Sequence, residues 1–195
     1  MEVKCLPLGA YQTNCYLGWG ENGDDCIVID PGYTPQAVLS EAQKWGKRIS
    51  AILLTHGHFD HVGGVRELME ETDCAVYLHE AELSLPPSIT DGALRYTDTY
   101  AEGSELRVAD LTIRVLHTPG HTPGSVCLIA ENVLFSGDTL FLQSMGRTDL
   151  PGGSTKDMVQ SLKRLSALEE DYRVLPGHGP GTTVRDNPPL RRTAV

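Results

Sequence analysis

The stretch Thr55-His56-Gly57-His58-Phe59-Asp60-His61 gathers histidine and aspartate at short spacing. Four of its side chains can bind a metal ion: His56, His58, Asp60 and His61. It follows the apolar run 49–55, which predicts a buried strand. If the chain stays extended beyond that strand, alternate side chains up to Asp60 share a face, and His61 turns towards a neighbouring ion as a helix begins. Groups crowded in this way need positive charge to hold them together, and two divalent ions would supply it.

Three further candidate ligands each follow a glycine in a separate loop. They are His121, Asp138 and His178, preceded by Gly120, Gly137 and Gly177. Glycine lets the main chain take tight or left-handed conformations, so it can aim the next side chain into a shared cavity. Each loop follows an apolar run, and loops held by a rigid sheet are where a site is expected. The sequence therefore predicts a two-metal centre built from four loops.

Apolar runs rich in valine, isoleucine and leucine predict strands throughout the chain. They cover residues 26–30, 49–55, 75–78, 111–116, 126–130, 132–135 and 173–175. Helical patterns occupy residues 35–45, 65–71 and 155–168. Thr34 is the expected N-cap of the first helix, and Ser154 with Asp157 forms the expected capping arrangement of the last. Strands and helices mixed in this way predict a layered α/β structure.

Length and composition fit one globular domain over residues 1–195, with 40% hydrophobic and 22% charged residues. The net charge of −10 argues against nucleic-acid binding, which depends on lysine and arginine neutralising phosphates. No apolar stretch approaches the roughly 20 residues that cross a bilayer, and the start lacks a signal-peptide profile, so we expect a cytoplasmic protein without membrane contact. The five cysteines are widely spaced and odd in number, which indicates reduced thiols. The sequence gives no indication of an oligomeric state.

In order along the chain, the motifs T-H-x-H-x-D-H, G-H-T, G-D-T and G-H-G resemble those of the metallo-β-lactamase fold superfamily. Within that superfamily the chain resembles glyoxalase II, the hydroxyacylglutathione hydrolase, and its short bacterial relatives. Four segments carry the closer resemblance: Gln12 to Tyr16, Asp30 to Gly32, Gly137 to Phe141 and Gly146 to Asp149. The motifs span the chain from the first strands to His178, and as a group they are highly specific.

The resemblance implies an α/β fold, a four-layered αββα sandwich with two metal ions at one edge of two facing sheets. By the family's pattern, one ion is held by His56, His58 and His121, and the other by Asp60, His61 and His178. Asp138 bridges the two ions, and Asp60 also serves catalysis together with a hydroxide between them. Nitrogen and carboxylate ligands suit zinc, which we expect first, and also iron or manganese.

The expected activity is hydrolysis of a small-molecule substrate, a hydroxyacyl thioester, to an acid and a thiol. Two ions about 3.5–4 Å apart lower the pKa of the water between them and polarise the carbonyl group. A thiol with a pKa near ~8.5 leaves without much help from an enzyme acid. Full-length glyoxalase II carries a C-terminal helical region that contacts glutathione. Residues 179–195 contain three prolines and can hardly form such a domain, so the thiol carrier stays open.

Other activities on the same fold remain alternatives. A persulfide dioxygenase shares much of the pattern, including a Gly-Arg-Thr-Asp segment, but uses a single iron. Lactone hydrolysis and β-lactam hydrolysis are further candidates, and a metal-stabilised binding module is the non-enzymatic one. Structural zinc sites usually fill all four positions with protein ligands, often cysteines. Seven ligands for two ions leave positions open for water and substrate, which favours an enzyme.

Two residues outside the ligand set each have two interpretations. Asp30 is either a turn residue or a group close to the ligands that orients an imidazole through a hydrogen bond. Arg147 either pairs with Asp149 or lines the site and contacts an anionic group of the substrate.

Two histidines match no ligand position of the family. His79 ends the run 75–78, and His117 lies four positions before His121. We expect both to be structural or surface residues, with His117 as a second-choice ligand.

Overall fold

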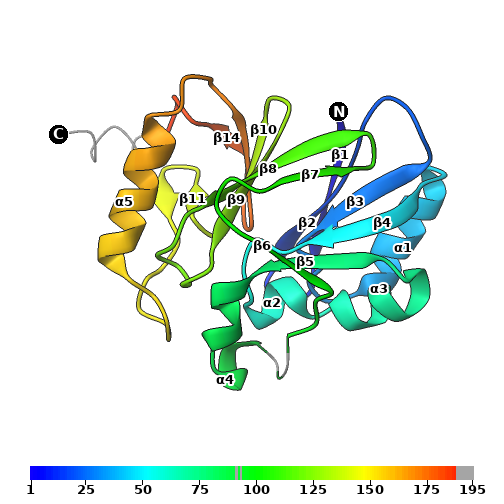
Figure 1. The fold of residues 1–195 in the computed structure, drawn as a ribbon, viewed down its shortest axis with the longest axis horizontal. Helices are drawn as coiled ribbons and strands as arrows, with labels where there is room; N and C mark the ends of the chain where they lie inside the picture. The colour runs from blue at the N-terminus through cyan, green and yellow to red at the C-terminus, as the bar shows by residue number, and fades with distance from the viewer. Residues whose placement is uncertain (91, 93, 188–195) are drawn as a thin grey trace.

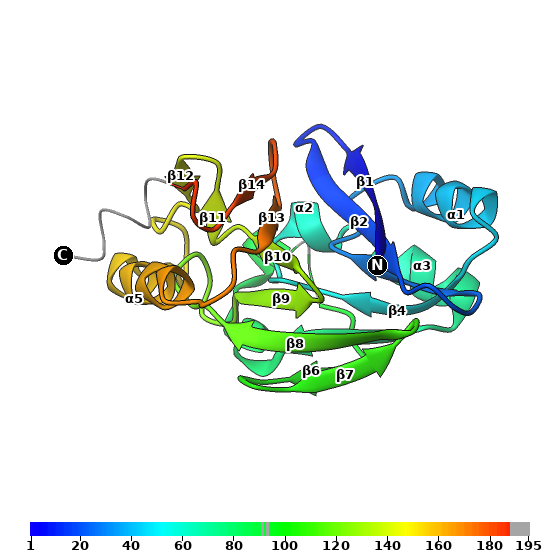
Figure 2. The same ribbon diagram turned by 90° about the horizontal axis from the view of Figure 1, so that it is seen from above.

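The computed structural model describes residues 1–90, 92 and 94–187 of the chain. Two six-stranded sheets face each other, and helices cover their outer sides (Figure 1). Helix α5 (Thr155–Ser166) lies at one side, and helices α1 (Pro35–Lys44) and α3 (Val65–Thr72) lie at the other, as Figure 2 shows from above. The layers follow in the order helix, sheet, sheet, helix, so the predicted α/β class and αββα sandwich are confirmed.

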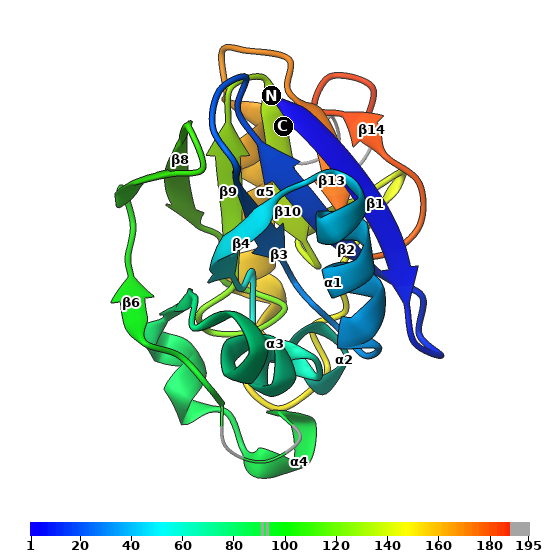
Figure 3. The same ribbon diagram turned by 90° about the vertical axis from the view of Figure 1, so that its right-hand side faces the viewer.

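The first sheet has the strand order β1-β2-β3-β4-β5-β6. Its strands are β1 (Glu2–Leu8), β2 (Thr13–Trp19), β3 (Asp25–Ile29), β4 (Arg48–Leu53), β5 (Ala75–His79) and β6 (Asp98–Tyr100). The first three strands pair antiparallel, and β3 to β6 pair parallel. Parallel neighbours need a crossover, which α1 supplies between β3 and β4 and α3 between β4 and β5. Both helices therefore lie against the outer face of this sheet (Figure 3).

The second sheet has the strand order β14-β13-β10-β9-β8-β7. Its strands are β7 (Glu105–Val108), β8 (Leu111–His117), β9 (Val126–Ala130), β10 (Val133–Gly137), β13 (Arg173–Pro176) and β14 (Thr182–Thr183). Antiparallel pairing joins β8, β9 and β10, and β13 runs parallel to β10. The carboxyl ends of β8, β10 and β13 therefore lie at one edge. A small ribbon of β11 (Leu140–Phe141) and β12 (Ser144–Met145) follows β10.

Short helices begin where two strands of the first sheet end. Helix α2 (Phe59–Val62) follows β4, and the 3-10 helix η1 (Glu80–Ser84) follows β5. Helix α4 (Pro87–Thr90) comes next in the chain. These elements lie on the side of the first sheet where its parallel strands end, and they bring polar side chains to that edge.

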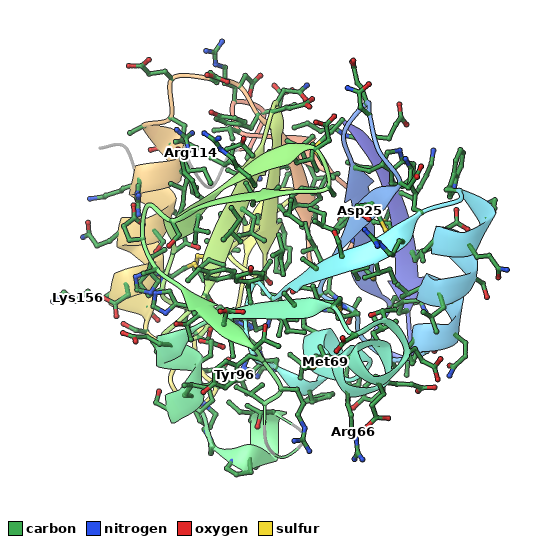
Figure 4. All side chains as sticks on the ribbon, turned by 45° about the vertical axis from the view of Figure 1, so that its right-hand side comes forward. Asp25, Arg66, Met69, Tyr96, Arg114 and Lys156 are labelled. Atoms are coloured by element: carbon green, nitrogen blue, oxygen red, sulfur yellow. The ribbon has the colours of Figure 1, made fainter. Side chains whose placement is uncertain are left out.

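Three hydrophobic clusters fill the spaces between the four layers. Strand β4 shows why, because Ile52 belongs to the cluster under α1 and α3 while its neighbour Leu53 belongs to the cluster between the sheets. Alternate side chains of a strand point to opposite faces, so a strand buried on both faces is a continuous apolar run. The third cluster joins α5, through Met158 and Leu162, to the second sheet. Figure 4 shows Lys156 on α5 pointing outwards at the left-hand edge of the view and Arg66 on α3 pointing outwards at its lower edge.

The seven predicted strands and three predicted helices are all present, with small differences at their ends. The side chain of Ser154 accepts a hydrogen bond from Asp157 N, as predicted. The predicted N-cap role of Thr34 is wrong, because its backbone is left-handed (φ 72°) and its side chain makes no capping hydrogen bond. Strands β1 and β2 were not predicted, since β1 is a partly exposed edge strand and Asn14 and Gly18 interrupt the apolar pattern of β2.

Two other expectations concern the whole chain. Within the described residues, no helix is long and apolar enough to cross a membrane. All five cysteines are free, four of them buried and Cys5 exposed. Residues 179–187 form β14 and turns, and residues 188–195 lie outside the described residues.

The cluster between the sheets is expected to dominate stability. Leu128 on β9 is fully buried there, whereas Leu83 on η1 is 47% exposed. Replacing Leu128 with alanine should lower the free energy of unfolding by about 2–5 kcal/mol, because the facing sheets cannot collapse into the cavity. Leu83→Ala should change it by less than ~0.5 kcal/mol. Urea unfolding of both variants measures the difference, and equal effects would contradict this packing.

Candidate metal centre

The predicted ligands come together at one edge of the sandwich. Their loops follow β4 in the first sheet and β8, β10 and β13 in the second. Three groups of side chains there have ligand atoms within 4.8 Å of one another. Two of them are the predicted sets: His56, His58 and His121, and then Asp60, His61 and His178. The third, Asp30, His56 and His61, overlaps with both. In the first group, His58 Nδ1 and His121 Nε2 are 2.9 Å apart. In the second, His178 Nε2 lies 3.2 Å from Asp60 Oδ2.

The carboxylate of Asp138 lies between the two groups. One oxygen, Oδ2, is 3.5 Å from His121 Nε2 of the first group and 3.7 Å from His178 Nε2 of the second. The other, Oδ1, is 3.5 Å from His61 Nε2. All seven predicted ligands thus form one cluster of side chains, and the carboxylate of Asp138 lies near members of both groups.

The local geometry of the first loop differs from the predicted extended segment. Strand β4 ends at Leu53, and helix α2 has already begun at Phe59. The expected alternation of His56, His58 and Asp60 is therefore wrong for Asp60, which lies in the first turn of α2 beside His61. The backbone changes from extended to helical after His58. His56 and His58 therefore join the first group, and Asp60 and His61 join the second.

Asp30 holds two of the histidines in place. Its Oδ1 accepts a hydrogen bond from Thr55 N (2.8 Å), and its Oδ2 accepts from Thr55 Oγ1 (2.5 Å) and His61 Nδ1 (3.0 Å). Since the Thr55 hydroxyl donates to Asp30, it can accept from His56 Nδ1, which lies 3.1 Å away. With Nδ1 engaged, each imidazole directs its Nε2 towards the other candidate ligands. This geometry matches the predicted orienting interpretation of Asp30, although Asp30 also begins a turn with φ 50°.

Two further imidazoles are oriented by main-chain carbonyl groups. His121 Nδ1 donates to the carbonyl of Arg147 (2.8 Å), and His178 Nδ1 donates to that of Tyr11 (3.2 Å). Their Nε2 atoms therefore face the other candidate ligands. Among the described residues, three ligand side chains hold a buried polar atom without a hydrogen-bond partner: His56 Nε2, His58 Nε2 and Asp138 Oδ1. Buried polar atoms are rarely left in this state, so this cluster of side chains fits metal ions.

The electrostatics differ between the two groups. Burial lowers the pKa of His56 strongly, and burial together with His121 lowers the pKa of His58 to about 3, so both rings are neutral. Burial alone would also lower the pKa of His61, but the carboxylates of Asp138 and Asp30 outweigh it and raise the pKa to about 9. The carboxylates around the second group therefore favour a positive charge there. Divalent cations would meet that demand in place of protons.

Burial shows from which side a substrate can arrive. The ligands from His56 to His121 along the chain are almost fully buried, except Asp60, whose side chain is partly accessible. The side chain of His178 is 30% exposed. The ring of Phe141 lies 6.4 Å from that of His178. Tyr11, whose main-chain carbonyl contacts His178 Nδ1, packs its ring edge-on against Phe59. The second group is thus the more accessible of the two.

Arg147 takes the simpler of its two predicted positions. Its guanidinium donates two hydrogen bonds to Asp149, at 2.7 and 2.8 Å, and the side chain is exposed. Only its main-chain carbonyl contacts the centre, through His121. Contact of the Arg147 side chain with a substrate stays a prediction, and it would compete with this ion pair.

His79 and His117 form a separate pair of stacked rings. Their centroids are 4.2 Å apart with an interplanar angle of 11°. His79 Nδ1 accepts from Ala81 N, and His117 Nε2 lies 2.9 Å from the Pro123 carbonyl. Neither ring belongs to the ligand groups of the described residues, which matches their predicted structural role.

Two polar residues that touch the centre were not predicted. Thr55 links Asp30 to His56, and Thr13 Oγ1 donates to Asp60 Oδ2 at 3.1 Å. Thr55 directly precedes His56 and Thr13 lies in the Gln12-to-Tyr16 segment, so both stand in motifs that were already notable. Their contacts depend on the fold, because 47 positions separate Thr13 from Asp60.

The chain matches known proteins over nearly its whole length. The model of the metallo-beta-lactamase superfamily matches residues 8–178. A probable metallo-hydrolase of Bacillus subtilis, YqgX, is 37% identical, and the match covers 94% of this chain and 93% of that protein. Hydroxyacylglutathione hydrolase GloC of Haemophilus influenzae is 31% identical, with 96% and 97% covered.

Two solved structures share both fold and sequence with the chain. The B3 metallo-beta-lactamase BLEG-1 superposes with a TM-score of 0.89 at 36% identity, covering 97% of this chain and 99% of the other. TTHA1623, solved in a di-iron-bound form, gives a TM-score of 0.83 at 42% identity, with 95% and 98% covered. The similarity thus extends across both sheets and all four ligand loops.

Replacing Gly137, the glycine before Asp138, is expected to lower the free energy of unfolding more than replacing an unobstructed glycine. Gly137 has φ 48°, and a Cβ there would lie 2.4 Å from Thr55 Oγ1. Gly46 has φ 64° but nothing within 4 Å of a Cβ. Alanine at either position should cost about 1–2 kcal/mol of backbone strain, and at Gly137 a further ~1–3 kcal/mol from the collision. Urea unfolding of both variants measures this, and equal losses would contradict the close approach.

Stability should depend on the protonation of His79. Burial, with a contribution from His117, lowers the pKa of His79. In the unfolded chain, where the histidine pKa is near ~6.5, His79 takes up a proton more readily than in the folded protein. Protonation of His79 therefore favours the unfolded chain, and native stability falls as the pH drops below that value. His79→Asn keeps an acceptor for Ala81 N without the titration. In urea unfolding of metal-free protein, the stability of wild type relative to this variant should be lower at pH 5.5 than at pH 7.5. An unchanged difference would contradict the assignment.

Proposed function

Because the chain belongs to the metallo-beta-lactamase superfamily, whose members bind divalent metals, we propose that it is a binuclear metal-dependent hydrolase acting on hydroxyacyl thioesters. The position of Asp138 carries the proposal. Its carboxylate lies within 3.7 Å of nitrogen atoms from both ligand groups, as a bridging ligand would require. A site with only one ion would leave no role for a carboxylate between two clusters.

The two groups would each hold one ion. The imidazoles of His56, His58 and His121 form the buried all-nitrogen group, and Asp60, His61 and His178 form the accessible one. Ions bound there would lower the pKa of water between them and polarise a substrate carbonyl. Zinc is the metal we propose first, and the di-iron form of TTHA1623 makes iron the chief alternative.

Asp60 would orient the attacking water. The hydrogen bond with His178 and the charge of His61 lower the pKa of Asp60 against the opposing effect of burial, so the carboxylate stays ionised. Thr13 donates to Oδ2 and fixes the plane of the carboxylate. A carboxylate with so low a pKa is a weak general base. Asp60 would therefore act by accepting a hydrogen bond from the water and orienting it.

The thioester is supported by two observations. GloC, a hydroxyacylglutathione hydrolase by name, matches the chain over 97% of its own length, so the likeness does not depend on an additional domain. The ring of Phe141, 6.4 Å from that of His178, offers aromatic surface next to the accessible group. A thiolate leaves without a general acid, so hydrolysis of a thioester would need no proton donor besides the candidate ligands.

Lactam hydrolysis is the second candidate, because BLEG-1 is a B3 metallo-beta-lactamase at 36% identity. An amine leaves less readily than a thiolate and needs protonation. Comparing thioesters, lactones, β-lactams and persulfides on one metal-analysed preparation separates these activities. We expect turnover of the thioesters to exceed that of the other substrates.

The bridging carboxylate gives the sharpest test by mutation. Asp138→Ala should lower thioester hydrolysis by at least ~100-fold, because both ions lose a shared ligand. Asp25→Ala removes a carboxylate at the start of β3 that pairs with Arg48, and should leave hydrolysis unchanged. Rates are measured by release of free thiol. Full activity in Asp138→Ala, or inactivity of wild type on every thioester, would overturn the proposal.

A further inference from the structure

Glu82 is a buried acidic residue that lies outside the ligand groups. It sits in η1 and is fully buried, and no lysine or arginine of the described residues forms an ion pair with it. Burial raises its pKa against the opposing effect of hydrogen bonds from Thr122, Gly57 and Gly124. A carboxyl group in this position does not help the core, since its desolvation is unfavourable. Its contacts indicate another role.

Each oxygen of this carboxyl group accepts from a different ligand loop. Gly57 N, between His56 and His58, donates to Oε2 at 2.5 Å. Gly124 N, three positions after His121, donates to Oε1 at 2.6 Å. One loop follows β4 of the first sheet and the other follows β8 of the second. Glu82 therefore joins the two sheets at the point where the first ligand group is formed.

The glycines leave room for this contact. A Cβ on Gly124 would lie 2.8 Å from Glu82 Cγ, and a Cβ on Gly57 would lie 3.1 Å from Glu82 Oε2. Neither glycine needs a left-handed backbone, because neither has a positive φ. Close approach of the Glu82 side chain thus explains Gly124, and at Gly57 Glu82 crowds the position together with Leu94 and Leu85. One main-chain hydrogen bond, from Val126 N to Thr55 O, also links the two segments, directly before His56, whereas Glu82 links them between His56 and His58.

We propose that Glu82 is a positioning residue that sets the distance between His56 and His58 on one sheet and His121 on the other, and so controls the affinity of the first ion. This inference rests on the two-metal site proposed above. The second group does not depend on Glu82, since Asp60, His61 and His178 are held by Thr13, Asp30 and the Tyr11 carbonyl. Loss of Glu82 should therefore weaken one ion and spare the other.

Glu82→Gln is the most direct variant. It keeps the size of the side chain but turns an amide NH₂ towards one of the two N–H donors, so one loop loses its acceptor. Glu80→Gln is the matched control, because Glu80 lies exposed in the same 3-10 helix and loses the same charge. Glu82→Asp is a second variant that keeps the charge but is one methylene too short to reach both loops.

The experiment is titration of metal-free protein with Co(II), followed by its absorption bands and by competition with a chelator. Wild type and Glu80→Gln should bind two Co(II) per chain. In Glu82→Gln the first ion should bind about 10–100-fold more weakly, with altered bands, and the second ion should be unchanged. Adding Glu82→Gln to His178→Ala, which weakens the second group, should still weaken binding of the first ion. Adding it to His58→Ala, which already disrupts the first group, should have no further effect on that ion.

The outcomes separate the two proposals. Wild type that takes up no Co(II) would overturn both the metal centre and the role of Glu82. Two ions bound by wild type and by Glu82→Gln with equal affinities and spectra would overturn the role of Glu82 alone. Equal weakening of both ions would also overturn it, because it would indicate a general effect on the fold. If Glu82→Gln fails to fold, Glu82→Asp decides in the same way.

Discussion

The carboxylate of Asp30 is the interaction on which the rest of the centre depends. It is buried, and it accepts three hydrogen bonds, two from Thr55 and one from His61. Through the Thr55 hydroxyl it also fixes the ring of His56. One acidic group thus turns the Nε2 atoms of two imidazoles from different groups towards the same cluster of candidate ligands, and it does so from a strand end that the sheet holds rigid. Ligands oriented in this way need no rearrangement before a metal binds.

The two-sheet sandwich brings the candidate ligands of the four loops together. Two sheets bring four loops to one edge, and each sheet contributes ligands to both groups: His56 and His58 meet His121, while Asp60 and His61 meet His178. A centre shared between two layers is sensitive to their separation. The apolar cluster between the sheets sets that separation over their length, and the contacts of Glu82 set it locally, at the loops themselves. Stability of the core and geometry of the centre are therefore linked.

Much of this could be predicted from the sequence, because buried strands and glycine-flanked ligands leave strong local patterns. Strand β4 is a continuous apolar run ending in the histidine motif, so its place and its role were both visible. Asp60 was assigned to an extended segment because nothing local marks the start of α2, whose four residues gain their structure from packing. Glu82 was not predicted at all. It resembles any acidic residue of a short helix, and its role arises only when Gly57 and Gly124, far apart in the chain, close around it.

We propose that Asp138 lies between two metal ions. Anomalous diffraction at the absorption edge of the bound metal, from crystals of the metal-loaded protein, tests it most directly. We expect two peaks per chain, one among His56, His58 and His121 and one among Asp60, His61 and His178, with the Asp138 carboxylate in contact with both. A single peak, or two peaks of which only one contacts Asp138, would contradict it.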